Sequence, residues 1–87
     1  MDPKELHVMQ ALEKAGATEH LSDREKHLIG LAVTTTRGCA YCTGGRTRKA
    51  LAAGIPQESL TAATDLVAAV NAGVAVRTVL QAIESHS

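Results

Sequence analysis

The stretch HLIGLAVTTTRGCAYCTGGRTRKALAAG, residues 27–54, decides the fold of this chain. In front of it, Ser22 is followed three residues later by Glu25, a capping box that predicts a helix over 23–36. A second periodic stretch follows over 39–53, between two glycines. Residues 28–36 are rich in β-branched side chains and suit a buried strand as well. The capping box and the alanine-rich remainder of the chain favour two consecutive helices.

The flanking sequence also contains helix start signals and apolar residues at helical spacing. Asp2 before a proline predicts a first helix over 3–16, and Pro56 opens a fourth helix with apolar residues at helical spacing. The Asn-Ala-Gly sequence at 71–73 predicts a break before a short final helix around Val76 to Ile83. We therefore expect an all-α subunit of about five helices that forms a single domain over residues 1–87.

Composition limits the possible partners. Nine Lys and Arg balance nine Asp and Glu, so the chain lacks the positive excess that a nucleic-acid binder needs. One tyrosine, with no Phe or Trp, also leaves no platform for stacking bases. The sequence shows no continuous apolar span and no signal peptide, so we expect no membrane contact and a cytoplasmic location.

The scarcity of aromatic residues predicts self-association. A core built from Ala, Leu, Val and Ile must be assembled from many small contacts, and small domains with thin cores often need a partner. We therefore expect a symmetric homo-oligomer, although the spacing of the apolar residues does not fix its symmetry.

The motif Cys39-Ala-Tyr-Cys42 is the chemically distinctive feature of the chain. Cysteines three residues apart on a helix lie on one face, close enough to form a disulfide. Cys39 follows Gly38 at a predicted helix start, where exposed backbone N–H groups lower the pKa of a thiol. Arg46 lies one turn after Cys42 and can stabilise a thiolate, although a guanidinium cannot act as a base. The pattern favours a redox pair.

Other interpretations of the cysteines remain open. Free cysteines are often simply small buried apolar residues. A zinc site would need two further ligands, and the chain has no second CxxC motif and no closely spaced histidine pair, so we expect no bound metal or cofactor. A thioredoxin-like fold would need a later sheet with a proline facing the cysteines, whereas the chain after Pro56 has a helical pattern.

From His27 to Gly54 the chain resembles the carboxymuconolactone decarboxylase superfamily and, within it, the alkylhydroperoxidase D-like group. The matching features are the LIGLAV run at 28–33, the Gly-Cys-x-x-Cys motif at 38–42, Ala50 and Gly54. The resemblance implies a helical subunit in a symmetric oligomer that reduces peroxides. It assigns peroxide attack to Cys42 and disulfide formation to Cys39, with an external thiol or dithiol as reductant. The helix-start argument instead makes Cys39 the more acidic thiol, so the identity of the nucleophile stays open.

Two positions depart from the proton relay of that group. Its Glu, twelve residues before the first cysteine, is His27 here, and its His, four residues after the second cysteine, is Arg46. One interpretation is an exchanged relay, in which His27 is the base and Arg46 holds Cys42 as a thiolate or binds an anionic group. The alternatives are a half-buried histidine with ordinary hydrogen bonds and a solvated surface arginine.

We thus predict a thiol-dependent peroxidase or disulfide redox protein whose catalytic residues are Cys42, Cys39, His27 and Arg46. The altered relay also fits a non-catalytic helical module for oligomerisation or ligand binding. A decarboxylase acting on a lactone acid, as the superfamily name suggests, is a weaker alternative, because the cysteine pair is typical of the redox branch.

Overall fold

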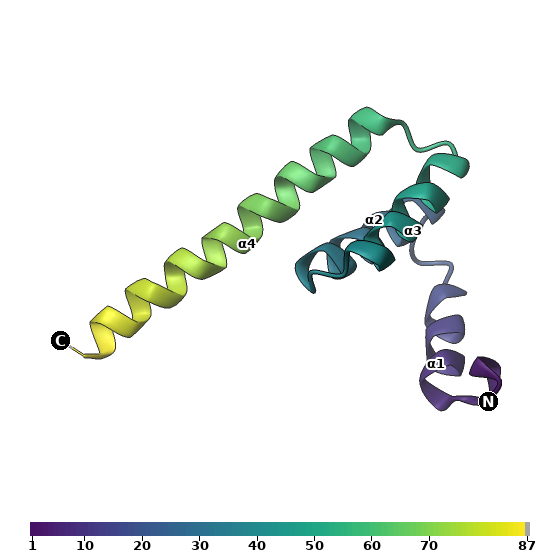
Figure 1. Ribbon diagram of the computed structural model, residues 1–87, viewed down its shortest axis with the longest axis horizontal. Coiled ribbons are helices and arrows are strands. Elements are labelled where there is room, and N and C mark those ends of the chain that lie inside the picture. The colour runs from purple at the N-terminus through teal and green to yellow at the C-terminus, as the bar shows by residue number, and fades with distance from the viewer. Residues whose placement is uncertain (87) are drawn as a thin grey trace.

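The computed structural model describes residues 1–86, and these residues form helices and connecting turns without any strand. The elements are a short 3-10 helix η1 (Pro3–Glu5) and the α-helices α1 (His7–Gly16), α2 (Asp23–Thr36), α3 (Ala40–Ala52) and α4 (Gln57–Ser85). Figure 1 shows α2 and α3 side by side, with the long α4 extending away from them. The all-α prediction is confirmed.

Helices α2 and α3 form an antiparallel hairpin. The predicted capping box begins α2: the Ser22 hydroxyl accepts the Glu25 N–H at 3.1 Å, and the Ser22 N–H donates to the Glu25 carboxylate at 2.7 Å. Residues 28–36, which also suited a strand, are helical. Near the closed end of the hairpin, the Thr43 hydroxyl donates to the Thr34 hydroxyl at 3.1 Å and fixes the register of the two helices.

The buried core of the described residues consists of only four side chains, which lie where α2, α3 and the start of α4 meet. They are Leu31, Ala50, Ile55 and Leu60. Gly54, with a φ of 91°, ends α3 in a conformation that glycine adopts freely, and the Ile55 N–H then donates to the Ala50 carbonyl at 3.1 Å. This turn brings Ile55 into the core and starts α4 alongside α2.

The predicted break at 71–73 is wrong, because α4 is continuous from Gln57 to Ser85. The side-chain amide of Asn71 donates to the Val67 carbonyl at 2.9 Å and to the Thr36 hydroxyl at 3.0 Å, so the residue supports the helix and also ties it to the end of α2. Four α-helices therefore replace the expected five in the described part of the chain.

The first predicted helix is also shorter than expected. Leu6 is extended with a ψ of 131°, so η1 ends at Glu5 and α1 begins only at His7. Figure 1 shows η1 and α1 as a unit that stands apart from the α2–α3 hairpin. No residue of this unit is buried.

The C-terminal half of α4 is apolar and uncovered. Val74, Val76, Val79, Leu80 and Ile83 each expose about three fifths of their surface. The radius of gyration of 16.5 Å exceeds the roughly 12 Å expected of a compact chain of this length. By length and composition alone α4 is also a candidate membrane span, and none of its apolar window is buried in the structure.

The capping box yields a stability prediction. Replacing Ser22 by Ala is expected to lower the free energy of unfolding by about 1 kcal/mol, since it removes the acceptor for an N–H group at the start of α2. Urea unfolding at fixed protein concentration measures this change. Ser22→Thr keeps a capping hydroxyl and serves as the matched control, so an equal loss in both variants would contradict the assignment.

The same motif predicts a pH dependence. Hydrogen bonds from the Ser22 backbone N–H and then from its side chain hold the pKa of Glu25 below its usual 4.5. A carboxyl group with a lowered folded-state pKa stabilises the fold above the unfolded pKa, and this contribution is lost as the pH falls through the folded value. The Glu25→Gln variant should therefore lose less stability than the wild type as the pH falls from 5 to 3.

Candidate functional site

The two cysteines lie at the first turn of α3 and are joined by a disulfide in the structure. Cys39 is the N-cap residue, and its sulfur accepts the backbone N–H of Cys42 at 3.2 Å. The Cα atoms of the pair are 5.3 Å apart, a separation within the usual range for disulfides. The predicted position of Cys39 at a helix start is confirmed.

Gly38 explains why the pair lies at this point. With a φ of 76°, Gly38 adopts the left-handed conformation that ends α2, which glycine can adopt without strain because it has no Cβ atom. The Gly38 N–H donates to the Thr35 carbonyl at 3.0 Å, and the Cys39 N–H donates to the Thr34 carbonyl at 3.1 Å. These two bonds satisfy the end of α2 and reverse the chain, so that α3 can begin directly after Cys39.

The two cysteine residues differ in exposure. Cys39 is half-buried at the turn, whereas Cys42 is exposed on the first turn of α3. The first turn of α3 carries no acidic residue, so the positive end of the helix dipole is uncompensated there.

Arg46 is half-buried and lies against α2. Its Nη1, Cζ and Nε atoms are 2.6, 2.8 and 3.0 Å from the point where a Cβ atom would stand at Gly30. Only the missing side chain of Gly30 leaves room for the guanidinium in this place. Within residues 1–86 Arg46 forms no ion pair and no hydrogen bond, so its charge is available to a ligand.

His27 does not reach the cysteines. It is half-buried on α2, seven residues before Thr34, whose hydroxyl bonds Thr43 next to Cys42. Seven residues of helix separate His27 from Thr34, which is about 10 Å along the axis of α2. Helical side chains also lean toward the helix N-terminus, which for His27 points away from the cysteines. Cys39 and Cys42 thus lie together at the start of α3, Arg46 follows one turn later with its guanidinium against Gly30, and His27 lies one turn before Gly30 on α2.

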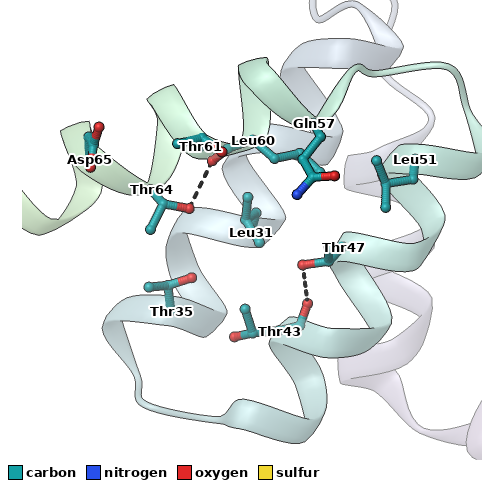
Figure 2. A pocket seen from close by; sticks show the side chains of 10 residues that line it. All are labelled: Leu31, Thr35, Thr43, Thr47, Leu51, Gln57, Leu60, Thr61, Thr64 and Asp65. Atoms are coloured by element: carbon teal, nitrogen blue, oxygen red, sulfur yellow. Dashed lines mark hydrogen bonds between the residues drawn. The ribbon is translucent and has the colours of Figure 1, made fainter.

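A separate groove of about 410 Å³ opens on another side of the hairpin. Figure 2 shows the threonines and leucines of α2, α3 and α4 around it. None of the four predicted site residues lines this groove. The residues that do are Leu31, Thr35, Thr43, Thr47, Leu51, Gln57, Leu60, Thr61, Thr64 and Asp65.

The groove was not predicted from the sequence, although the repeated threonines on α3 and α4 are a visible signal. Two of its hydroxyls are already occupied within their own helices. Thr47 donates to the Thr43 carbonyl at 2.8 Å, and Thr64 donates to the Leu60 carbonyl at 2.8 Å. The groove therefore offers mainly apolar surface with a single carboxylate, Asp65.

Metal binding finds no support in the geometry. Within the part of the chain that the structure describes, no three His, Cys, Asp or Glu side chains gather in a group that could hold an ion. The zinc interpretation of the cysteine motif would therefore require ligands from outside the subunit.

Comparison with known proteins gives one family match. The family model of the carboxymuconolactone decarboxylase family matches residues 3–85, nearly the whole chain. The chain belongs to this family. No curated protein and no solved structure gives a significant match.

Proposed function

We propose that this chain is a thiol-dependent peroxidase, in which Cys39 and Cys42 alternate between dithiol and disulfide. The observation that carries the proposal is the disulfide at the first turn of α3, with one sulfur exposed and the other at the N-cap. Membership of the carboxymuconolactone decarboxylase family is compatible with this role.

The first step of the proposed cycle consumes the peroxide. The Cys42 thiolate attacks the terminal oxygen of a hydroperoxide, and the O–O bond breaks. Cys42 becomes a sulfenic acid, while the leaving alkoxide takes a proton and departs as an alcohol. Exposure of Cys42 supports its assignment as the attacking group, because a peroxide can approach it from solvent.

The second step restores a stable oxidised state. The Cys39 thiol condenses with the Cys42 sulfenic acid, which forms the disulfide and releases water. An external thiol or dithiol then donates two electrons and two protons and returns the pair to its reduced form. The helix start suits Cys39 for this role, because the thiolate that attacks the sulfenic acid is favoured there.

In this proposal Arg46 assists the Cys42 thiolate, whereas His27 has no direct role at either sulfur. Arg46 lies one turn after Cys42 and contributes positive charge on the same side of α3, which favours the Cys42 thiolate. His27 lies too far along α2 for direct proton transfer to either sulfur. Proton exchange with solvent at the exposed Cys42 replaces the histidine base of the sequence hypothesis.

The threonine-lined groove does not suit the decarboxylase alternative, so a lactone acid would have to bind at Arg46 instead. A lactone acid is an anion, and anions are usually bound by Arg or Lys side chains. The threonine-lined groove has no cationic residue among its lining side chains and carries the carboxylate of Asp65. The non-catalytic alternative remains one outcome of the experiment that follows.

Replacing Cys42 by Ser is expected to reduce peroxide consumption, in the presence of dithiothreitol, to the background rate of the reductant. Cys39→Ser, reduced beforehand and assayed without dithiothreitol, should still consume about one peroxide per subunit, because only the condensation step is lost. Cumene hydroperoxide consumption, followed with purified protein, measures both effects.

Tyr41→Phe is the matched control for these variants, since Tyr41 lies between the cysteines and is 88% exposed. It should retain the wild-type rate. If the wild type is no faster than the reductant alone, or if Cys42→Ser is as fast as the wild type, the peroxidase proposal is wrong and the non-catalytic module is favoured.

We further propose that the subunit assembles with copies of itself through α4. Apolar side chains lie on every side of its central and C-terminal turns, a pattern typical of a helix that is surrounded by other elements. The accessible surface of 7097 Å² exceeds by about 2,200 Å² the value expected of a folded monomer of this mass. An excess of this size is comparable to the area that stable interfaces bury.

A protein interface suits α4 better than a lipid environment. Arg77 lies within the apolar stretch of α4 and would be costly in a hydrocarbon core, whereas Asp65 lies just before this stretch. In an oligomer, the same residues can stay at the polar rim of an interface.

Val79→Glu should therefore shift the protein toward monomer, because it places a charge on the apolar surface of α4. Sedimentation velocity without detergent measures the change. Gln81→Glu adds the same charge at a polar position two residues away and should leave the wild-type oligomer intact. A monomeric wild type, or a wild type that requires detergent and co-floats with liposomes, would contradict the proposal and in the latter case indicate a membrane helix.

A further inference from the structure

The segment from residue 26 to residue 57, which covers most of α2 and all of α3, is cationic, although the chain as a whole is neutral. From residue 26 to residue 57 the sequence contains no Asp or Glu, and all nine acidic residues lie outside this segment. The basic residues within it are Lys26, Arg37, Arg46, Arg48 and Lys49. A local positive field of this kind attracts anionic ligands to the cysteine end of the hairpin.

Arg46 is the cation in this segment that is held between two helices. Its guanidinium lies in the space that Gly30 leaves open on α2 and has neither an ion pair nor a hydrogen bond among residues 1–86. A guanidinium offers five N–H donors in a fixed planar arrangement that matches a carboxylate. A half-buried and unpaired group of this type is a ready receptor for an anionic group.

The distance from this guanidinium to the cysteines suits a small substrate. The guanidinium lies beside Gly30, which precedes Thr34 by four residues on α2. The Thr34 hydroxyl bonds that of Thr43, the residue after Cys42. At 1.5 Å per residue, the guanidinium is therefore about 6 to 8 Å from Cys42 along the helix axis. A chain of about six carbons spans such a separation. One end of a substrate can thus meet Arg46 while its other end reaches the exposed sulfur.

We infer that Arg46, in the space opened by Gly30, binds the carboxylate of an organic hydroperoxide and directs its peroxide group toward Cys42. The preferred substrate class is therefore a hydroperoxide that carries a carboxylate, and neutral hydroperoxides such as cumene hydroperoxide are turned over less efficiently. The peroxide part of this inference rests on the proposed function, whereas the binding of a carboxylate at Arg46 does not.

The two sides of the hairpin differ in charge, which supports this choice. The threonine-lined groove holds Asp65 and no cation, so it disfavours an anion. At the Arg46 side, Lys26 and His27 lie about one turn before Gly30 and are the next polar residues along α2 that could contact an anionic group.

A binding experiment without peroxide tests the site itself. Hexanoate should slow the alkylation of the reduced protein by neutral iodoacetamide several-fold at Cys42, measured by mass spectrometry of the labelled peptide, whereas the same concentration of 1-hexanol should not. Arg46→Ala should abolish this protection. Lys49→Gln, which removes an exposed cation one turn later, should keep it.

Glycine variants test the role of the space on α2. Gly30→Ala places a methyl group where the guanidinium lies and should weaken the hexanoate protection, because the flexible end of Arg46 must move. Gly45→Ala makes the same chemical change on α3, where nothing lies within 4 Å of the added carbon, and should leave the protection unchanged. In an Arg46→Ala background, Gly30→Ala should have no further effect.

Turnover then tests the substrate class. The wild type should use a hydroperoxy-hexanoic acid about tenfold more efficiently, in kcat/KM, than its methyl ester, and Arg46→Ala should remove this preference.

Equal protection by hexanoate and hexanol, or protection that survives Arg46→Ala, overturns the inference. Equal turnover of acid and ester overturns the substrate class and leaves the peroxidase proposal intact. Arg46-dependent protection without any peroxide turnover supports the carboxylate site and overturns the peroxidase.

Discussion

The reversal of the chain at Gly38 is the constraint on which the rest of the structure depends. Its left-handed conformation lets the Gly38 and Cys39 N–H groups satisfy the last carbonyls of α2, and α3 then begins without a longer loop. This single turn places a sulfur at a helix N-cap and makes α2 and α3 antiparallel. The antiparallel register in turn brings Arg46 opposite Gly30. A side chain at position 38 would strain the turn and disturb the fold and the cysteine pair together.

The rest of the molecule supports this hairpin only weakly within one subunit. Four buried side chains form the core, and the hydrogen bonds from Arg24 to Ser59 and from Asn71 to Thr36 align the first half of α4 with α2. Among the described residues, no side chain in the second half of α4 is buried. Self-association through α4 would therefore stabilise the hairpin, and with it the geometry of the cysteines, so stability and function are coupled in the proposed assembly.

Local signals in the sequence were sufficient to predict the all-α class, the start of α2 and the position of Cys39, because capping residues and glycines act over a few residues. Tertiary contacts were not predictable in this way. The Asn-Ala-Gly sequence at 71–73 has the composition of a break, yet Asn71 finds partners in Val67 and in Thr36 of another helix. The contact of the Arg46 guanidinium with Gly30 joins residues from two helices. The distance of His27 from the sulfurs depends on the register between those helices. The threonine-lined groove likewise needs three helices in place.

The central claim is that Cys39 and Cys42 form a reversible redox pair. Equilibration of the wild-type protein in thiol–disulfide buffers, followed by acid quenching, alkylation and mass spectrometry, tests it most directly. The account predicts one two-electron transition between the dithiol and an intrachain disulfide, with a reduction potential above about −300 mV. A potential below that value, or cysteines that form only separate mixed disulfides with the buffer, would contradict the account.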